Sequence, residues 1–221
     1  MQEYTKIIDV IDTSGGNYIL RVEKNDIKFN AGQFFSIGLD HLGINREYSV
    51  ASSDKENFID FFIREVDQGA LSGNLRNLKK GDKIKILGPY GEFYIRDFDQ
   101  NAEYVFFATG TGIAPFISLI DTHDIKKYRI FHGIREFKDN YNLKKLNNYN
   151  LAVSREKING ITKVDHENIY FGRINQFVNK LEVNKSMLFF LCGNSLMVSD
   201  LYDELLDKGV KQDKIFTEIF F

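Results

Sequence analysis

The sequence contains a single cysteine and no tryptophan. One cysteine excludes an intramolecular disulfide and a four-cysteine iron–sulfur cluster within these 221 residues, and it favours a reducing compartment. The formal net charge is −2, so the overall charge gives no reason to expect nucleic-acid binding. Aromatic packing is left to 20 phenylalanines and 11 tyrosines.

Long apolar segments are also missing. The first ten residues, MQEYTKIIDV, lack a basic segment followed by an apolar one, so we expect no signal peptide. The run Met187–Cys192 is far too short to span a bilayer. We therefore expect a cytoplasmic protein whose length suffices for two modest domains or one large one.

Short segments rich in aromatic and β-branched residues dominate the chain up to about residue 98, a boundary good to a few positions. Six of them at this spacing predict an antiparallel barrel or sandwich, with one helical interruption near Leu71–Leu78. The expected strands are Tyr4–Ile11, Tyr18–Val22, Phe34–Leu39, Arg46–Ala51, Phe58–Val66 and Lys83–Leu87.

The pattern changes after Gln100. Strand candidates at 104–108, 128–132, 149–153 and 187–192 alternate with helical segments at 113–121, 173–181 and 195–208. This alternation is typical of an α/β domain with a parallel sheet and crossover helices. Ligands of such sheets bind outside the carboxyl ends of the strands, where glycine-rich and polar segments follow three of the candidates.

A strand, a glycine turn and a helix start follow one another in YVFFATGTGIAPFISL, residues 104–119. Glycines let the backbone approach an anion, and the free N–H groups of a helix start attract it. Pro115 suits the first helical turn because it lacks an N–H group. The spacing is not that of G-x-G-x-x-G. Taken alone, the pattern fits a pyrophosphate site and an ordinary α/β turn about equally.

Several motifs occur in one order along the chain. They are Arg46-Glu47-Tyr48-Ser49, Gly69-Ala70-Leu71-Ser72, Gly88-Pro89-Tyr90-Gly91, residues 109–115, Val153-Ser154-Arg155-Glu156, Leu191-Cys192-Gly193-Asn194 and Glu218-Ile219-Phe220. Together they resemble the ferredoxin–NADP reductase family over essentially the whole chain. The resemblance implies an FAD-binding β-barrel in residues 1–98 and an NADP-binding α/β domain in residues 99–221.

The resemblance assigns the FAD-binding residues. It places the Arg46 guanidinium on the pyrophosphate, the Tyr48 ring on the isoalloxazine and Ser49 near flavin N5, roles that suit these side chains. The alternatives are a surface Arg46 with a core Tyr48, and a plain helix-capping Ser72. The other implied FAD contacts are Phe62, Arg64, Gly69, Leu71, Ser72 and the near-terminal Phe220, with Phe221 as the competing aromatic.

The segment Ser154-Arg155 follows a strand candidate. A hydroxyl and a guanidinium suit a phosphomonoester, whereas an acidic residue there would favour the free ribose hydroxyl of NAD. The resemblance assigns this pair to the 2′-phosphate of NADP; an ion pair of Arg155 with Glu156 is the alternative. The implied NADP-binding residues are Thr109, Gly110, Thr111, Gly112, Pro115, Ser154, Arg155, Tyr170, Arg173, Cys192, Gly193 and Asn194.

The resemblance predicts an enzyme that transfers hydride between NADPH and the N5 atom of FAD and exchanges electrons with ferredoxin or flavodoxin. Ser49, Cys192 and Glu218 line the predicted reaction site. Four histidines and one cysteine lack metal-ligand spacing, so no metal site is expected. We expect a monomer, and a basic docking face drawn from Arg64, Arg76, Lys79, Lys80, Lys83 and Lys85. A solvated lysine-rich face is the alternative, and the sequence favours it for Lys79 and Lys80, which precede a Gly-Asp turn.

Two other functions use similar motifs. A free-flavin reductase, or a diaphorase-type reductase component of an oxygenase, would need the same flavin and nicotinamide residues. A non-catalytic binding module on the same fold is a second alternative, and the joint presence of Arg46, Tyr48, Ser49, Cys192 and Glu218 argues against it.

Overall fold

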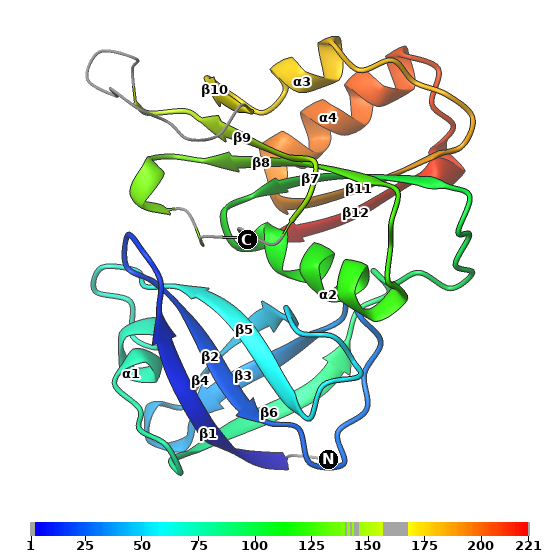
Figure 1. The fold of residues 1–221 in the computed structure, drawn as a ribbon. Coiled ribbons are helices and arrows are strands. Elements are labelled where there is room, and N and C mark those ends of the chain that lie inside the picture. Colours follow the sequence, from blue (N-terminus) through cyan, green and yellow to red (C-terminus); the bar gives the residue numbers. More distant parts are fainter. Residues whose placement is uncertain (1–2, 140, 142, 144–145, 157–167, 221) are drawn as a thin grey trace. The chain divides into compact units, whose positions relative to one another are not determined.

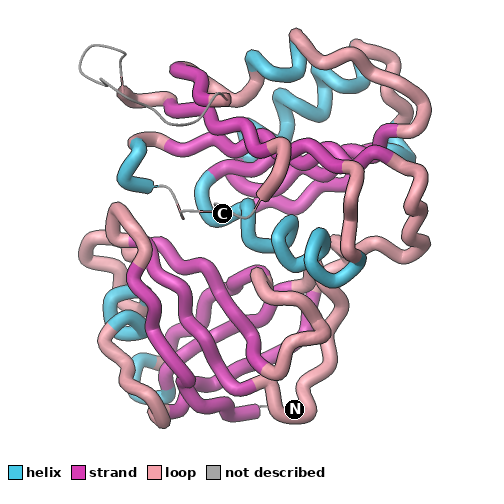
Figure 2. Tube along the Cα trace, in the orientation of Figure 1, coloured by secondary structure: helices cyan, strands magenta, loops and turns pink. Residues whose placement is uncertain are grey.

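The computed structural model describes residues 3–139, 141, 143, 146–156 and 168–220. The chain divides into two compact units, drawn in Figures 1 and 2. The first contains residues 1–98 and 114–124, and the second contains residues 99–113 and 125–221. Within the described ranges, no helix is long and apolar enough to cross a membrane.

An antiparallel sheet forms the first unit, in the order β4-β3-β6-β1-β2-β5. A bridge between Val50 and Phe61 joins the end of β4 to β5, so the sheet closes into a barrel. The predicted antiparallel barrel is confirmed. Its strands are β1 (Glu3–Asp12), β2 (Asn17–Glu23), β3 (Phe34–Leu39), β4 (Ile44–Ser49), β5 (Phe58–Arg64) and β6 (Lys83–Tyr90).

Alternate residues of these strands fill the barrel. Leu20, Ile37 and Phe61 are fully buried in one cluster, as expected for strands with one face turned inward. Two helices belong to this unit, α1 (Ser72–Arg76) and α2 (Ala114–His123). The sequence places α2 after the first strand of the second unit, yet its contacts assign it to the barrel.

Helix α2 is held to the barrel by polar and aromatic contacts. The Ser118 hydroxyl donates to the Ser52 carbonyl oxygen at 2.6 Å, and the hydroxyls of Ser53 and Thr122 lie 3.1 Å apart. The rings of Phe93 and Phe116 are 6.1 Å apart. Hydroxyls buried in this way are stabilised only when they are hydrogen-bonded, so these contacts specify where α2 docks.

A parallel sheet forms the second unit, in the order β10-β9-β8-β7-β11-β12. The predicted α/β class is confirmed. Its strands are β7 (Glu103–Thr109), β8 (Tyr128–Ile134), β9 (Tyr149–Val153), β10 (Ile169–Phe171), β11 (Met187–Asn194) and β12 (Ile215–Phe220). The helices α3 (Gln176–Asn179) and α4 (Ser195–Asp207) lie on one face of the sheet (Figure 1).

The two faces of this sheet carry different residues. Phe107 and Leu191 pack in one cluster with Val178 of α3 and Leu201 of α4. The other face is aromatic: Phe106 lies 5.6 Å from Phe190, whose ring stacks on Phe216 at 4.7 Å. Burial on both faces explains why the central strands read as unbroken apolar runs.

The observed elements differ from the expected ones in the region between β8 and β11. The helix expected over 173–181 is reduced to Gln176–Asn179, and β10 was not foreseen. Between β8 and β9, where the sequence predicted no helix, the described part of the segment holds a single 3₁₀ turn, Phe137–Asp139.

Candidate functional site

The order of the parallel strands contains a switch point beside β7. From β7 the chain continues to β8, β9 and β10 on one side, and then returns to β11 and β12 on the other. The connections that leave β7 and β11 therefore lead to strands on opposite sides of this point, β8 and β12, and open α/β sheets bind ligands at the carboxyl ends of the strands there. Two of the predicted nucleotide-binding segments, Thr109–Gly112 and Cys192–Asn194, lie at this point.

Glycines allow these two loops to touch. A Cβ atom on Gly112 would collide with the Cys192 backbone, and one on Gly193 (φ 133°) would collide with Thr109. The Asn194 N–H donates to Thr109 Oγ1 at 2.9 Å, which fastens the loops together. Gly110 differs, because its φ of 54° is left-handed and a Cβ there would meet no atom within 4 Å. A glycine is favoured at 110 by its left-handed backbone and not by a close contact.

Asn194 also begins helix α4. Its side-chain oxygen accepts a hydrogen bond from the Met197 N–H at 3.4 Å, as a helix N-cap does. Gly209 ends the helix at φ 82°, and its N–H donates to the Leu206 carbonyl oxygen at 2.8 Å. An asparagine before the first turn and a left-handed glycine after the last one therefore set the two ends of α4.

Cys192 and Glu218 stand opposite each other on β11 and β12. The Cys192 thiol is fully buried, and its Sγ lies 3.8 Å from Glu218 Oε2. Burial raises the pKa of Cys192 well above its usual value, and the Glu218 carboxylate raises it further. The thiol is therefore neutral at pH 7 and donates to Glu218, so it acts as neither a thiolate nucleophile nor a thiolate metal ligand there.

Phe220 lies two residues beyond Glu218. Side chains alternate along a strand, so Phe216, Glu218 and Phe220 share one face of β12. Phe216 stacks on Phe190, which places all three on the face of β11 that carries Cys192. Phe221, the competing aromatic, lies outside the described residues.

Ser154 and Arg155 follow β9 at the same carboxyl edge and are exposed. The Ser154 hydroxyl donates to the Ile134 carbonyl oxygen at 3.2 Å. Glu156 Oε1 accepts from the Phe137 N–H at 2.9 Å. Among the described residues, no carboxylate forms an ion pair with Arg155, which contradicts the simple Arg155–Glu156 pair considered above.

Tyr170 and Arg173 lie on and just after β10, beside β9. Tyr170 is half-buried and meets Phe177 edge-on at 4.5 Å, with the Lys180 ammonium 5.5 Å from its ring. Arg173 is exposed. One edge of the sheet therefore presents Ser154, Arg155 and Arg173, with an aromatic ring next to them.

Strand β4 of the first unit carries the next predicted set. Arg46 is exposed and donates from Nη1 to the Asn45 carbonyl oxygen at 2.8 Å. The described structure gives its guanidinium no carboxylate partner. Tyr48 packs against the barrel core, and burial raises its pKa to about 12. Ser49, the last residue of β4, is 5% exposed.

Phe62 and Arg64 share one face of β5, opposite the face that enters the barrel core. Phe62 is 7% exposed, whereas Arg64 is exposed. Leu71 is buried in the core and precedes the first residue of α1. Gly69 is tightly packed, since a Cβ there would lie 2.8 Å from the Val66 carbonyl oxygen.

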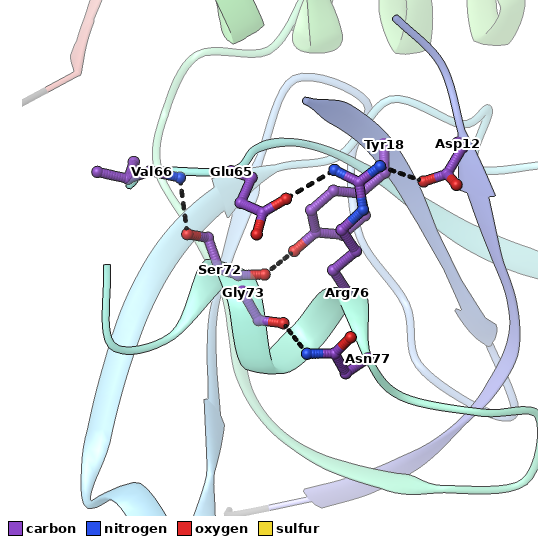
Figure 3. A network of polar contacts seen from close by, with 8 residues as sticks. All are labelled: Asp12, Tyr18, Glu65, Val66, Ser72, Gly73, Arg76 and Asn77. Atoms are coloured by element: carbon purple, nitrogen blue, oxygen red, sulfur yellow. Dashed lines mark hydrogen bonds and ion pairs between the residues drawn. The ribbon is translucent and has the colours of Figure 1, made fainter. Parts of the chain in front are cut away.

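Ser72 is fixed by two bonds at the start of α1 (Figure 3). Its hydroxyl accepts from the Val66 N–H at 3.0 Å, and its carbonyl oxygen accepts from the Tyr18 hydroxyl at 2.6 Å. The plain helix-cap alternative is wrong, because Leu71 occupies the cap position and Ser72 bonds backward. Arg76, expected on a docking face, is held by Glu65 and Asp12 at 2.7 Å each.

Two residues near the nucleotide loops were missed by the sequence reasoning. Arg135 follows β8 and is exposed. Its carbonyl oxygen accepts a hydrogen bond from the Arg155 N–H at 2.9 Å. An arginine directly after a strand is the sequence feature that could have identified it. His132 is fully buried on β8 and bonds to the Gly110 carbonyl oxygen. A histidine inside an apolar strand gives no such signal.

Known proteins share both units. An oxidoreductase FAD-binding domain family matches residues 9–95, and an oxidoreductase NAD-binding domain family matches residues 106–203. A flavodoxin/ferredoxin–NADP reductase of Buchnera aphidicola subsp. Baizongia pistaciae is 30% identical over 83% of this chain and 82% of its own length. The phenol hydroxylase P5 protein of Acinetobacter pittii is 27% identical over the whole of this chain.

The chain spans less than two thirds of several curated relatives that it matches. The shares are 66% for the P5 protein and 46% for the ferredoxin–NADP reductase of Azotobacter vinelandii. Among solved structures, the ferredoxin NADP+ reductase of Neisseria gonorrhoeae with bound FAD and NADP has the same fold. Its TM-score is 0.86 at 22% identity, over 100% of this chain and 99% of that one.

Proposed function

Since this chain belongs to the ferredoxin–NADP reductase family of oxidoreductases, with FAD- and NAD(P)-binding domains, we propose that it moves electrons between NADPH and a one-electron protein carrier, a ferredoxin or a flavodoxin. Residues 1–98 are the proposed FAD domain and residues 99–221 the proposed nucleotide domain. The observation that carries the proposal is the neutral Cys192 thiol paired with the Glu218 carboxylate, beside the glycine loops of the switch point.

The barrel residues fit FAD. Arg46 offers a guanidinium without an ion pair among the described residues, which suits a pyrophosphate. Tyr48 presents a ring to the isoalloxazine, and Ser49 a hydroxyl to its edge. Phe62, Arg64, Gly69, Leu71 and Ser72 complete the proposed FAD contacts. When bound, FAD links the two-electron chemistry of NADPH to one-electron carriers because it is stable at three oxidation levels.

The sheet edge fits NADPH. Thr109, Gly110, Thr111, Gly112 and Pro115 form the proposed pyrophosphate loop, with Gly193 and Asn194 facing it. The proposed 2′-phosphate site uses Ser154, Arg155 and Arg173, beside the aromatic Tyr170 for the adenine. Within the described ranges Arg155 has no carboxylate partner, and Glu156 accepts from the Phe137 N–H through Oε1.

The proposed reaction residues would orient a bound nicotinamide ring. Cys192 presents a small neutral thiol to the ring, and its proton stays on sulfur because Glu218 accepts that hydrogen bond. Glu218 places a carboxylate beside the site, where it would stabilise positive charge on a bound nicotinamide. Phe220 is the proposed aromatic cover of the flavin. Fixed positions of this kind favour a near-attack geometry for hydride transfer.

A reductase component of an oxygenase system is the second candidate. Its support is the similarity to the P5 protein and to a phenol 2-monooxygenase reductase component of Pseudomonas sp., 29% identical over 62% of this chain. Both candidates use the same cofactor residues and differ in the protein that exchanges electrons with the flavin.

An anaerobic titration of the holoprotein with NADPH tests the proposal. We expect bleaching of a flavin spectrum, followed by reoxidation on addition of ferredoxin or flavodoxin. Reoxidation by an oxygenase component alone would favour the second candidate. Reoxidation by free flavin alone would exclude both, and a colourless protein that takes up no FAD would refute the flavoenzyme itself.

A further inference from the structure

His132 lies at the centre of the second unit and has no part in the function proposed above. It is fully buried on β8. Its Nδ1 lies 2.6 Å from the Tyr149 hydroxyl, at the start of β9. Its Nε2 lies 2.8 Å from the carbonyl oxygen of Gly110, just after β7. The imidazole thus connects three neighbouring strands.

The partners of His132 determine where its proton sits. A peptide carbonyl oxygen only accepts hydrogen bonds, so Nε2 carries the hydrogen and donates to Gly110. Nδ1 then presents a lone pair and accepts from the Tyr149 hydroxyl. Burial lowers the pKa of His132 to about 4 and raises that of Tyr149, so both groups are neutral at pH 7.

This bond fixes the direction of the next peptide group. The peptide between Gly110 and Thr111 is trans, since the cis bond of the described chain is Gly88–Pro89. In a trans peptide the C=O and N–H groups point in opposite directions. Because the Gly110 carbonyl points to His132, the Thr111 N–H points away from it, and the space beside Gly110 is open.

We propose that His132 is a positioning residue, which aims the Thr111 N–H at the pyrophosphate of the bound dinucleotide while Tyr149 locks the imidazole tautomer. The inference rests on the proposed function, because it requires a dinucleotide at this loop. It goes beyond that function by assigning a role to two side chains that do not touch the nucleotide.

Two substitutions of nearly equal polarity test the bond to Gly110. The amide nitrogen of His132→Gln falls at the position of Nε2 and keeps the donor, whereas that of His132→Asn falls at the position of Nδ1 and loses it. We expect His132→Asn to weaken NADP+ binding about ten-fold, the value of one hydrogen bond, and His132→Gln to stay within about three-fold of the natural protein.

The ligand 2′-AMP separates positioning from general damage. It carries the 2′-phosphate but no pyrophosphate, so both variants should bind it as tightly as the natural protein does. Tyr149→Phe keeps the ring and removes the hydroxyl that bonds to His132 Nδ1. We expect this variant to bind NADP+ a few-fold more weakly and to bind 2′-AMP unchanged. This third variant decides the question if His132→Asn does not fold.

Three results would overturn the inference. They are equal NADP+ affinities in all variants, equal losses in His132→Gln and His132→Asn, or losses that extend to 2′-AMP. Failure of the proposed function looks different, because the natural protein itself would then bind neither NADP+ nor NAD+. If it binds only NAD+, the same comparison is made with NAD+ against adenosine.

Discussion

The thiol of Cys192 and the carboxylate of Glu218 are hydrogen-bonded across two parallel strands, with Sγ 3.8 Å from Oε2. The pair lies beside the loop that opens at Gly110, and the carboxylate keeps the proton on the sulfur. A neutral thiol packs against a ligand ring without reacting with it.

The Cys192 thiol should resist alkylation in the folded protein. Its deprotonation should also reduce the stability of the fold at high pH. Its pKa is raised in the folded state, so its full contribution is present below the pKa of the unfolded thiol and is lost as pH rises. We expect iodoacetamide at pH 8 to label the unfolded chain and not the folded one. Between pH 8 and pH 10, the free energy of unfolding measured in urea should fall more steeply for the natural protein than for Cys192→Ala. Equal pH dependence in the two proteins would refute the raised pKa of Cys192.

His132 should make the protein sensitive to mild acid. Its pKa of about 4 lies below the unfolded value of 6.5, so the stability it contributes is present above pH 6.5 and declines as pH falls towards 4. Between pH 7 and pH 5 the natural protein should lose about 2 kcal/mol more than His132→Gln in urea unfolding. If the free energy of unfolding falls equally in the natural protein and in His132→Gln, the pKa of His132 is not lowered by folding.

Arg46 should retain FAD. Arg46→Ala removes the guanidinium proposed for the pyrophosphate, and we expect FAD affinity to fall about ten- to a hundred-fold, as for the loss of a charge-assisted hydrogen bond. Arg96→Ala is a matched control, because Arg96 is exposed and paired with Glu92. Flavin content and a fluorescence titration measure the effect, and release of FMN alone would contradict the assignment of FAD.

Arg155 should set the preference for NADPH. We expect Arg155→Ala to raise the KM for NADPH about ten- to a hundred-fold and to leave that for NADH nearly unchanged. Lys138→Ala is the control, since Lys138 is exposed nearby and paired with Glu136 at 2.6 Å. An equal loss with both nucleotides would show that Arg155 supports the fold rather than the 2′-phosphate.

The barrel should present a basic surface to an acidic electron carrier. Lys6 and Lys83 stand opposite each other on β1 and β6, Tyr4 pairs with Lys85, and Lys79 and Lys80 are exposed just before β6. We expect Lys79→Glu with Lys80→Glu to slow electron transfer to ferredoxin or flavodoxin, most strongly at low salt.

The control for this surface is the pair Lys185→Glu and Lys211→Glu, which changes the net charge equally on the other unit. The rate at which NADPH reduces a small dye should be unchanged by all four charge reversals. If protein and dye reduction respond alike, these lysines do not guide a partner.

The sequence allowed the ends of the parallel strands to be identified as the nucleotide site, because glycine and polar residues follow apolar runs in 104–112, 151–155 and 187–194. Local patterns could not give pairings between distant residues. The alignment of Cys192 with Glu218 depends on the register of β12, and the neutralisation of Arg76 depends on Asp12, 64 residues away. His132 escaped notice because its partners, Tyr149 and Gly110, are also distant in sequence.

Helix α2 has a consequence for how this chain can be divided. The backbone passes between the two units at residues 98–99, 113–114 and 124–125, so no single cut yields both of them intact. A fragment ending at residue 98 would leave Phe93 without Phe116 and the Ser52 carbonyl without its donor. Separate expression of the halves should therefore give an incomplete barrel, whereas a barrel that includes residues 114–124 through an engineered linker should fold.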